Sequence, residues 1–265
     1  MTAVELPAVD TPAILIDLDV VSRNLTWMQN KADTHGVALR PHIKTHKIPE
    51  LALMQTRLGA CGITVAKISE AEVMAEAGID DILIANQVVT GDKLKRLLAL
   101  SRRLQISVGL DGIPAARKLS EIFSAAGLLI DYLIEIDTGL NRCGVLPGID
   151  AVKLFQAVDT LPALRFRGIF THAGQAYGAG SLEQVMDVSI LESGLMADTV
   201  KGFQELGVSL EIVSVGSTPT MKVWQGNRSV NEIKRSLRFT GLLLVIWCFL
   251  NAFWILPVAQ WNRFL

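Results

Sequence analysis

Short apolar runs rich in β-branched residues alternate with helical patterns along most of the chain, and this alternation limits the possible folds most strongly. Between the runs, apolar residues recur at helical spacing, as at Leu94, Leu97 and Leu98. Regular alternation of strands and helices predicts a parallel sheet with right-handed crossovers. Seven runs are candidate strands: residues 38–43, 62–66, 82–85, 105–110, 132–136, 166–171 and 211–215.

The number of these units favours a closed barrel over an open sheet. Seven or eight strand and helix units fit an α/β fold of the TIM-type (β/α)8 class, in which functional residues gather at the C-terminal ends of the strands. No G-x-G-x-x-G follows an early strand, and this argues against a doubly wound dinucleotide-binding sheet. The chain has 265 residues, which is long for one domain and short for two. We therefore expect one barrel with at most a fragment of another domain.

Composition excludes several functional classes. Half of the residues are apolar and the formal charge is −1, which argues against a disordered chain and against a nucleic-acid-binding body. The three cysteines, Cys61, Cys143 and Cys248, are too few for a disulfide framework and lack C-x-x-C spacing. We therefore expect a reducing, cytoplasmic location and a small-molecule ligand.

The first cluster of polar residues, at 40–47, follows the first candidate strand and contains Lys44 between His42 and His46. A lysine that attacks a carbonyl must be neutral part of the time, and nearby positive charge and partial burial both lower its pKa. Lys44 is therefore a candidate Schiff-base lysine. The alternative is a solvated basic loop.

The second cluster, at 135–144, follows the fifth candidate strand and contains Arg142. A planar, permanently charged guanidinium suits a phenolate or carboxylate oxygen. The alternative is an ion pair between Arg142 and Asp137 within the loop.

Two further clusters follow the sixth and seventh candidate strands. Residues 171–178 offer His172 as a stacking face and Tyr177 as a hydroxyl. Residues 215–220 offer backbone N–H groups and three hydroxyls at the position where barrel enzymes frequently bind phosphate. Taken alone, the histidine could be structural and the turn is weak evidence. One ligand has the four groups that these clusters would bind. Pyridoxal 5'-phosphate contains a carbonyl, a ring, an anionic ring oxygen and a phosphate.

Four ordered motifs between about Thr11 and Ile233 resemble the family of D-serine dehydratases and D-threonine aldolases, which shares the alanine-racemase-type N-terminal barrel (pyridoxal-phosphate fold type III). The motifs are R-P-H-I-K-T-H-K at 40–47, E-I-D-T-G-L-N-R-C-G-V at 135–145, T-H-A-G-Q-A-Y-G at 171–178 and V-S-V-G-S-T-P-T at 213–220. The resemblance implies that Lys44 is the Schiff-base lysine and that Gly216, Ser217 and Thr218 hold the phosphate. It also implies that His172 stacks on the pyridine ring, that Arg142 lies near the phenolic oxygen, and that Tyr177 and Gln87 face the cofactor.

The resemblance predicts a lyase that dehydrates D-serine or cleaves D-threonine by a retro-aldol reaction, in either case a D-β-hydroxy amino acid. The alternatives are an inactive or residual cofactor-binding protein and an amino-acid racemase. In the family the active site is commonly completed across a dimer, so a homodimer is one assembly to expect.

The chain departs from the family after Ile233. The expected last barrel strand and C-terminal β-domain are missing from the sequence, so we predict a barrel over 1–233 and an atypical tail over 234–265. The family's divalent metal, zinc, is held in that β-domain by a histidine with a cysteine or an aspartate. All four histidines of this chain lie at or before His172. We therefore predict no bound metal.

The tail differs in composition from the rest of the chain. It contains four basic residues and no acidic one, and residues 239–261 form an uncharged run of 23 residues. A frameshift or truncation explains these features together. A membrane anchor is the second interpretation, because a span needs about 20 apolar residues and basic residues precede the run. A buried helix is the third.

Overall fold

The computed structural model describes residues 13–236, 243–249 and 252–257. By their internal contacts, the residues fall into two compact units, one formed by 29–237 and the other by 1–28 with 238–265. The larger unit contains the complete parallel sheet and the four sequence clusters.

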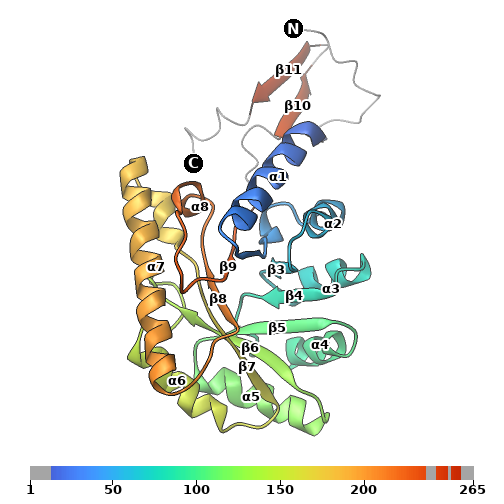
Figure 1. Cartoon of the computed structure of the whole chain (residues 1–265). Coiled ribbons are helices and arrows are strands. Elements are labelled where there is room, and N and C mark those ends of the chain that lie inside the picture. The colour runs from blue at the N-terminus through green and yellow to red at the C-terminus, as the bar shows by residue number, and fades with distance from the viewer. Residues whose placement is uncertain (1–12, 237–242, 250–251, 258–265) are drawn as a thin grey trace. The chain divides into compact units, whose positions relative to one another are not determined.

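An eight-stranded parallel sheet forms the larger unit (Figure 1), in the order β2-β9-β8-β7-β6-β5-β4-β3. All seven predicted strands are present. A parallel bridge between His42 and Thr64 joins the two outer strands, β2 and β3, so the sheet closes into a ring. The predicted α/β barrel is therefore confirmed. The seven strands are β2 Ala38–Leu39, β3 Ile63–Val65, β4 Asp81–Ile84, β5 Gln105–Leu110, β6 Ile130–Ile136, β7 Leu164–Thr171 and β8 Ile212–Val215.

The eighth strand, β9 Glu232–Ile233, corrects the prediction that the last barrel strand is missing. It pairs with β8 on one side and with β2 on the other. Beyond β9 the chain keeps to the sheet, because His42 N–H donates to the Arg235 carbonyl at 3.0 Å and His42 also bridges Ser236. Residues 234–236, which follow the predicted domain boundary, thus continue the barrel wall.

Within the larger unit, helices follow the strands and lie outside the ring (Figure 1). The apolar spacing at Leu94, Leu97 and Leu98 falls within α4, which confirms that helix. The helices are α1 Leu18–Thr34, α2 Pro49–Arg57, α3 Ile68–Glu76, α4 Gly91–Ser101, α5 Ile113–Ala125, α6 Ile149–Asp159, α7 Leu182–Glu205 and the short α8 Thr220–Val223, with 3-10 turns η1 Ile43–Thr45 and η2 Gly174–Gly178.

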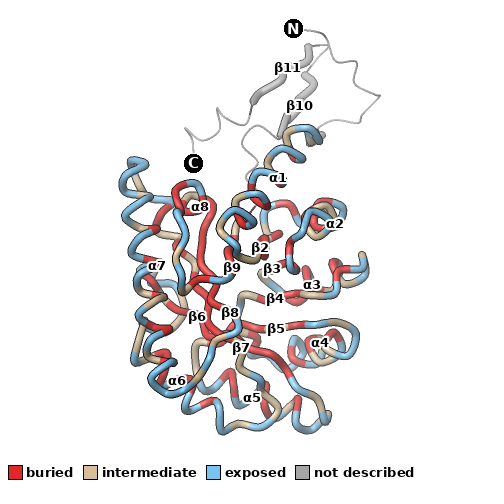
Figure 2. Tube along the Cα trace, viewed as in Figure 1, coloured by how far each residue is buried: buried red, intermediate tan, exposed pale blue. Residues whose placement is uncertain are grey.

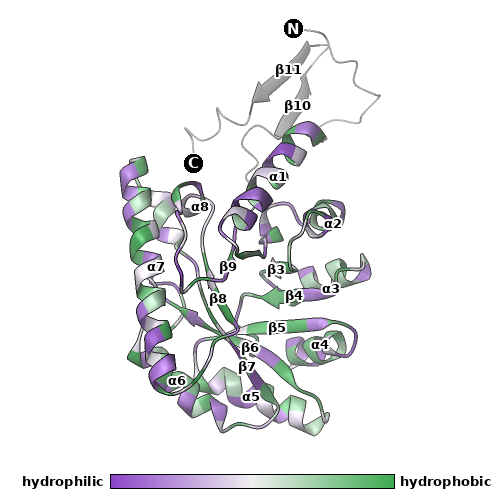
Figure 3. Ribbon diagram, viewed as in Figure 1, coloured by the Kyte–Doolittle hydropathy of each residue, from purple (hydrophilic) through white to green (hydrophobic). Residues whose placement is uncertain are grey.

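The strands are the most buried part of the larger unit (Figure 2) and are largely hydrophobic (Figure 3). Every residue of β6 is buried, as expected for a parallel strand covered on both faces. Leu83, Leu133 and Phe170 pack together as one apolar cluster of the core. Phe166 and Tyr132 instead pack towards the helices, where Phe166 lies 4.7 Å from Phe155 between ring centroids.

The smaller unit contains a three-stranded antiparallel sheet in the order β1-β10-β11. These strands are β1 Ala13–Ile16, β10 Leu243–Phe249 and β11 Ala252–Pro257. The described parts of the apolar run at 239–261 are therefore strands, which contradicts the interpretation of the tail as a buried helix. The membrane-anchor interpretation stays a prediction. None of the helices in the described residues is long and apolar enough to cross a membrane. The frameshift interpretation stays a prediction.

Candidate active site

An open pocket lies at the C-terminal ends of the barrel strands and brings together residues from all four sequence clusters. Six of the eight predicted site residues line it, namely Lys44, Arg142, His172, Gly216, Ser217 and Thr218. The other two, Gln87 and Tyr177, are not among the lining residues. The remaining lining residues are His42, Thr64, Ala85, Glu135, Phe170, Thr171, Lys234, Arg235 and Ser236.

Lys44 lies on the 3-10 turn η1, directly after β2. His42 holds the start of this turn, because its Nδ1 accepts a hydrogen bond from the Lys44 backbone N–H at 3.3 Å. Partial burial lowers the pKa of Lys44, and the Arg142 guanidinium lowers it further, while Glu70 opposes the effect. This environment increases the neutral fraction of the amine, as a carbonyl-reactive lysine requires.

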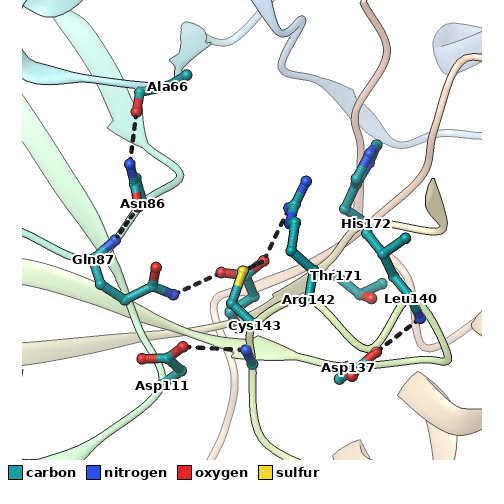
Figure 4. A network of polar contacts seen from close by, with 12 residues as sticks. Ala66, Asn86, Gln87, Asp111, Asp137, Leu140, Arg142, Cys143, Thr171 and His172 are labelled. Carbon is teal, nitrogen blue, oxygen red and sulfur yellow. Dashed lines mark hydrogen bonds and ion pairs between the residues drawn. The ribbon is translucent and has the colours of Figure 1, made fainter.

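Arg142 is held by Glu135 rather than by Asp137. Its Nη2 lies 3.5 Å from Glu135 Oε1, on the buried strand β6 (Figure 4). Asp137 Oδ1 instead accepts backbone N–H groups of the following loop, among them that of Leu140 at 2.9 Å. The predicted alternative partner was therefore wrong, because the short Asp137 side chain is used to shape its own loop.

Gln87 binds the other carboxylate oxygen of Glu135. Its Nε2 donates to Glu135 Oε2 at 2.9 Å, and Cys143 Sγ lies 3.2 Å from Glu135 Oε1 (Figure 4). Gln87 therefore orients Glu135, and through it Arg142, from outside the residues that line the pocket. The spacing of residues in the sequence could not show whether Gln87 lines the pocket or holds a residue that does.

His172 lies where β7 ends, and its Nδ1 is 3.3 Å from the Gly216 carbonyl oxygen. Burial lowers its pKa to about 4, helped by the nearby charge of Lys44. The ring is therefore neutral near pH 7 and suits stacking against another flat ring. Tyr177 lies on η2 and is 60% exposed, so within the larger unit its side chain is turned to solvent.

The turn at 216–218, predicted to bind an anion, has fewer free backbone N–H donors than expected. Gly216 N–H donates to Glu192 Oε1 and Ser217 N–H donates to Thr220 Oγ1, both at 2.9 Å. These two N–H groups are already hydrogen-bonded, because buried backbone N–H groups need acceptors within the protein. Within the described residues, the Thr218 N–H donates to no protein acceptor. The Thr218 hydroxyl donates to the Ser236 carbonyl oxygen at 3.2 Å, and the Ser217 hydroxyl lies 3.0 Å from Thr220 Oγ1. An anion would thus meet the Thr218 N–H and would share these two hydroxyls with their present partners.

Two charged residues that the sequence did not single out complete the site. Lys234 is 6% exposed and lines the pocket with its Nζ 3.9 Å from the centre of the Phe170 ring. Glu192 on α7 has no exposed surface and holds Gly216 from behind. Lys234 stands in the basic segment that the sequence assigned to the tail, so its position in the sequence did not mark it as a site residue. Glu192 gave no signal within its polar helical segment.

Metal ligation is not supported by any group in the part of the chain that the structure describes. No three His, Cys, Asp or Glu side chains lie close enough there to hold an ion. The absence of a bound metal stays a prediction, because the resemblance places the family's metal in a segment beyond the barrel.

Comparison with known proteins matches the barrel to one family model and finds enzymes of similar sequence. The family model described as "Alanine racemase, N-terminal domain" matches residues 16–234. The chain is 38% identical over 213 residues to the D-threonine aldolase of Arthrobacter sp, covering 80% of this chain and 56% of the relative. It is 36% identical over 233 residues to the D-threo-3-hydroxyaspartate dehydratase of a Delftia species, covering 86% of this chain and 60% of the relative.

A solved structure supports the same relationship. The crystal structure of D-threonine aldolase from Filomicrobium marinum matches with a TM-score of 0.79 and 39% identity, covering 86% of this chain and 62% of that chain. The chain therefore spans somewhat more than half the length of the relatives that it matches.

Proposed function

This chain belongs to the alanine racemase N-terminal domain family, and on that premise we propose that it binds pyridoxal 5'-phosphate through Lys44 and acts as a lyase on D-β-hydroxy amino acids. One observation carries the proposal. A neutralisable lysine, an oriented arginine, a neutral histidine ring and a hydroxyl-rich turn line a single pocket. The relatives named D-threonine aldolase and D-threo-3-hydroxyaspartate dehydratase supply the substrate class.

The residues present fit this cofactor by the chemistry of their donors. Four cationic side chains line the pocket, Lys44, Arg142, Lys234 and Arg235, against the single carboxylate of Glu135. Such a balance favours a ligand with several negative charges, as a phosphate ester has. The turn is also tight, because a Cβ added at Gly216 would lie 2.5 Å from the Lys234 carbonyl oxygen.

The chain's own residues have separate tasks in this proposal. Lys44 would bind the carbonyl and, once released, would act as a base that takes the Cα proton in a dehydration or the β-hydroxyl proton in a retro-aldol cleavage. Arg142, fixed by Glu135, would hold an anionic ring oxygen, and neutral His172 would pack against the ring face. When bound, pyridoxal phosphate supplies an electron sink for bond cleavage at Cα. The Thr218 N–H would bind the phosphate, and the Ser217 and Thr218 hydroxyls would join it by giving up their contacts with Thr220 and Ser236.

The test is whether the purified chain binds the cofactor and turns over a D-amino acid. We expect visible absorbance from lysine-bound cofactor in the wild type and its loss in Lys44→Ala, because Lys44 is the amine proposed to bind the carbonyl covalently. Lys93→Ala is the matched control, since Lys93 is an exposed residue of α4 outside the pocket. Absorbance that survives Lys44→Ala would contradict the role of Lys44.

Product analysis then separates the activities. Pyruvate from D-serine, or glycine and acetaldehyde from D-threonine, with and without added divalent metal, would support the lyase. Cofactor absorbance with no product would indicate a binding protein without lyase activity. Loss of optical activity from one pure enantiomer without cleavage would indicate a racemase.

A further inference from the structure

The Lys234 amine lies in the interior of the pocket and has no hydrogen-bond partner among the described residues. Its backbone is fixed, because its N–H donates to the Val215 carbonyl at 2.8 Å. Its side chain is 6% exposed, and among the described residues its Nζ makes no hydrogen bond. The Phe170 ring below it, at 3.9 Å, offers a cation–π contact only. A buried ammonium group normally requires a hydrogen-bonded anion.

Each carboxylate near Lys234 has a partner other than the lysine. Glu232 Oε2 accepts from Arg40 Nε at 2.8 Å, while Glu232 Oε1 makes no hydrogen bond among the described residues. Glu135 accepts from Gln87 and is paired with Arg142. Both carboxylates raise the pKa of Lys234 through space, but burial outweighs them and lowers it to about 8. Neither carboxylate hydrogen-bonds to Nζ, so the donors of this amine remain available to a ligand.

We propose that Lys234 is an anion-binding residue of the pocket, whose Nζ binds a negatively charged oxygen of the bound ligand. This inference rests on the proposed function for the identity of the ligand, but not for the existence of the site. Two kinds of oxygen share the required chemistry, that of a phosphate ester and that of a substrate carboxylate. Lys44 and Lys234 then have different tasks, since Lys44 binds a carbonyl and Lys234 an anion.

The experiment compares ligand affinities of Lys234→Met, Lys234→Arg and the exposed control Lys93→Met by isothermal titration calorimetry. The probes are inorganic phosphate, pyridoxal 5'-phosphate, unphosphorylated pyridoxal, and succinate added to the cofactor-loaded protein. We expect Lys234→Met to weaken binding of one anionic probe by about 10- to 100-fold, because a charged hydrogen bond is lost. Lys234→Arg should recover part of that loss, and Lys93→Met should match the wild type.

The pattern of losses identifies the anion. Weaker phosphate and pyridoxal phosphate binding with unchanged pyridoxal binding assigns Lys234 to the phosphate. Weaker succinate binding with unchanged phosphate binding assigns it to a carboxylate. Unchanged affinity for both anions overturns the inference while leaving the proposed function intact. Absence of cofactor absorbance in the wild type, with phosphate binding that still depends on Lys234, would overturn the proposed function alone.

The stability of the Lys234→Met variant separates a packing role for Lys234 from an anion-binding role. If the lysine served packing alone, Lys234→Met would lower the unfolding midpoint and leave affinity unchanged in the folded fraction. An unpaired buried charge instead costs stability, so we expect the methionine variant to be at least as stable as the wild type. A second measurement needs no variant. Acetylation of Lys234 in the wild type, mapped by mass spectrometry, should slow when the bound anion is added, and unchanged labelling would contradict the site.

Discussion

At the scale of single residues, Glu192 places a fully buried carboxyl group behind the turn that would receive an anion. Burial raises its pKa to about 7, against the stabilising effect of the Gly216 N–H. The folded chain therefore binds this proton more tightly than the unfolded chain, whose carboxyl has its ordinary pKa near 4.5. Below pH 4.5 the Glu192 carboxyl is protonated in both states, so its ionisation does not lower the free energy of unfolding. As the pH rises to 7 and above, its ionisation destabilises the fold.

The prediction is that Glu192→Gln becomes increasingly more stable than the wild type between pH 5 and pH 8. The glutamine oxygen can still accept from Gly216, but it carries no charge to desolvate. The difference at pH 8 should reach roughly 3 kcal/mol, the equivalent of a pKa moved from 4.5 to about 7. Urea unfolding at the two pH values measures it. Identical pH profiles for the two proteins would refute this account of Glu192.

His172 should act through its ring and not through its charge. Its pKa of about 4 keeps the imidazole neutral above pH 5. We therefore expect His172→Ala to lower cofactor affinity by about fivefold, the loss of a stacking contact worth on the order of 1 kcal/mol, and His172→Phe to retain most of that affinity. Fluorescence titration of the three proteins between pH 5 and 8 checks both points. A titration step in wild-type affinity near pH 6.5 that His172→Phe abolishes would indicate a charged role instead.

Six of the eight site residues that the sequence predicted line the pocket. Lys44, Arg142 and His172 each follow a strand, and strand ends of a parallel barrel meet at one face. Lys234 was hidden because it stands next to Arg235 at the start of a basic segment, which indicated a tail. Glu192 was hidden because its partner Gly216 lies 24 residues away, and only the packing of α7 on the barrel brings the two together.

At the scale of elements, a one-residue bulge in β7 decides which side chains reach the pocket. Tyr132 pairs with Phe166, but the next residue, Leu133, pairs with Gly168, so Arg167 is the extra residue. Phe166 consequently packs towards the helices, whereas Phe170, an even number of residues later, belongs to the core cluster and lines the pocket. Without the bulge, the alternation of β7 would place Phe170 and His172 on the outer face.

Gly168 makes this bulge possible, and replacing it should be costly. Its φ is +145°, and a Cβ there would lie 1.9 Å from the Ile212 carbonyl oxygen of β8. We expect Gly168→Ala to destabilise the fold by about 3 kcal/mol or more through strain and overpacking. Gly194→Ala is the control, because Gly194 lies within α7 with open space around it and should gain about 0.5–1 kcal/mol. Thermal unfolding of both variants measures these changes, and equal stabilities would be incompatible with a backbone role for Gly168.

Strand length explains which elements could be predicted. β5 and β6 contain runs of six and seven residues, which the apolar pattern shows clearly. β9 has only two residues, one of them a glutamate, so its pattern is indistinguishable from a loop. The burial of Glu232 comes from a partner on another strand, Arg40, and no local pattern encodes that pairing.

At the scale of the whole barrel, a buried ion-pair cluster joins strands that are distant in sequence. Arg40 Nε donates to Glu232 at 2.8 Å, and Arg40 Nη1 donates to Asp81 at 2.6 Å. Arg40 is 6% exposed and Glu232 is 3% exposed. Removing the guanidinium would leave the buried Glu232 carboxylate without its ion-pair partner, which typically costs 3–5 kcal/mol.

We therefore expect Arg40→Met to lower the free energy of unfolding by about 3–5 kcal/mol. The double variant Arg40→Met with Glu232→Met should recover much of this loss, because it removes the uncompensated charge as well. Lys201→Met, which breaks the exposed pair with Asp198, is the control and should change little. Equilibrium denaturation of the four proteins provides the measurement. A double variant no more stable than Arg40→Met would mean that the cluster acts through packing rather than charge.

The closure of the ring at β2 also sets the order of events during biosynthesis. Arg40 and Glu232 lie 192 residues apart along the chain, yet β2 is held between β3 and the last strand. A ribosome that adds 5–20 residues per second needs roughly 10 to 40 seconds to make this stretch. For that time β2 has one open edge, and nascent chains of this length offer chaperones, or each other, an unpaired strand to bind.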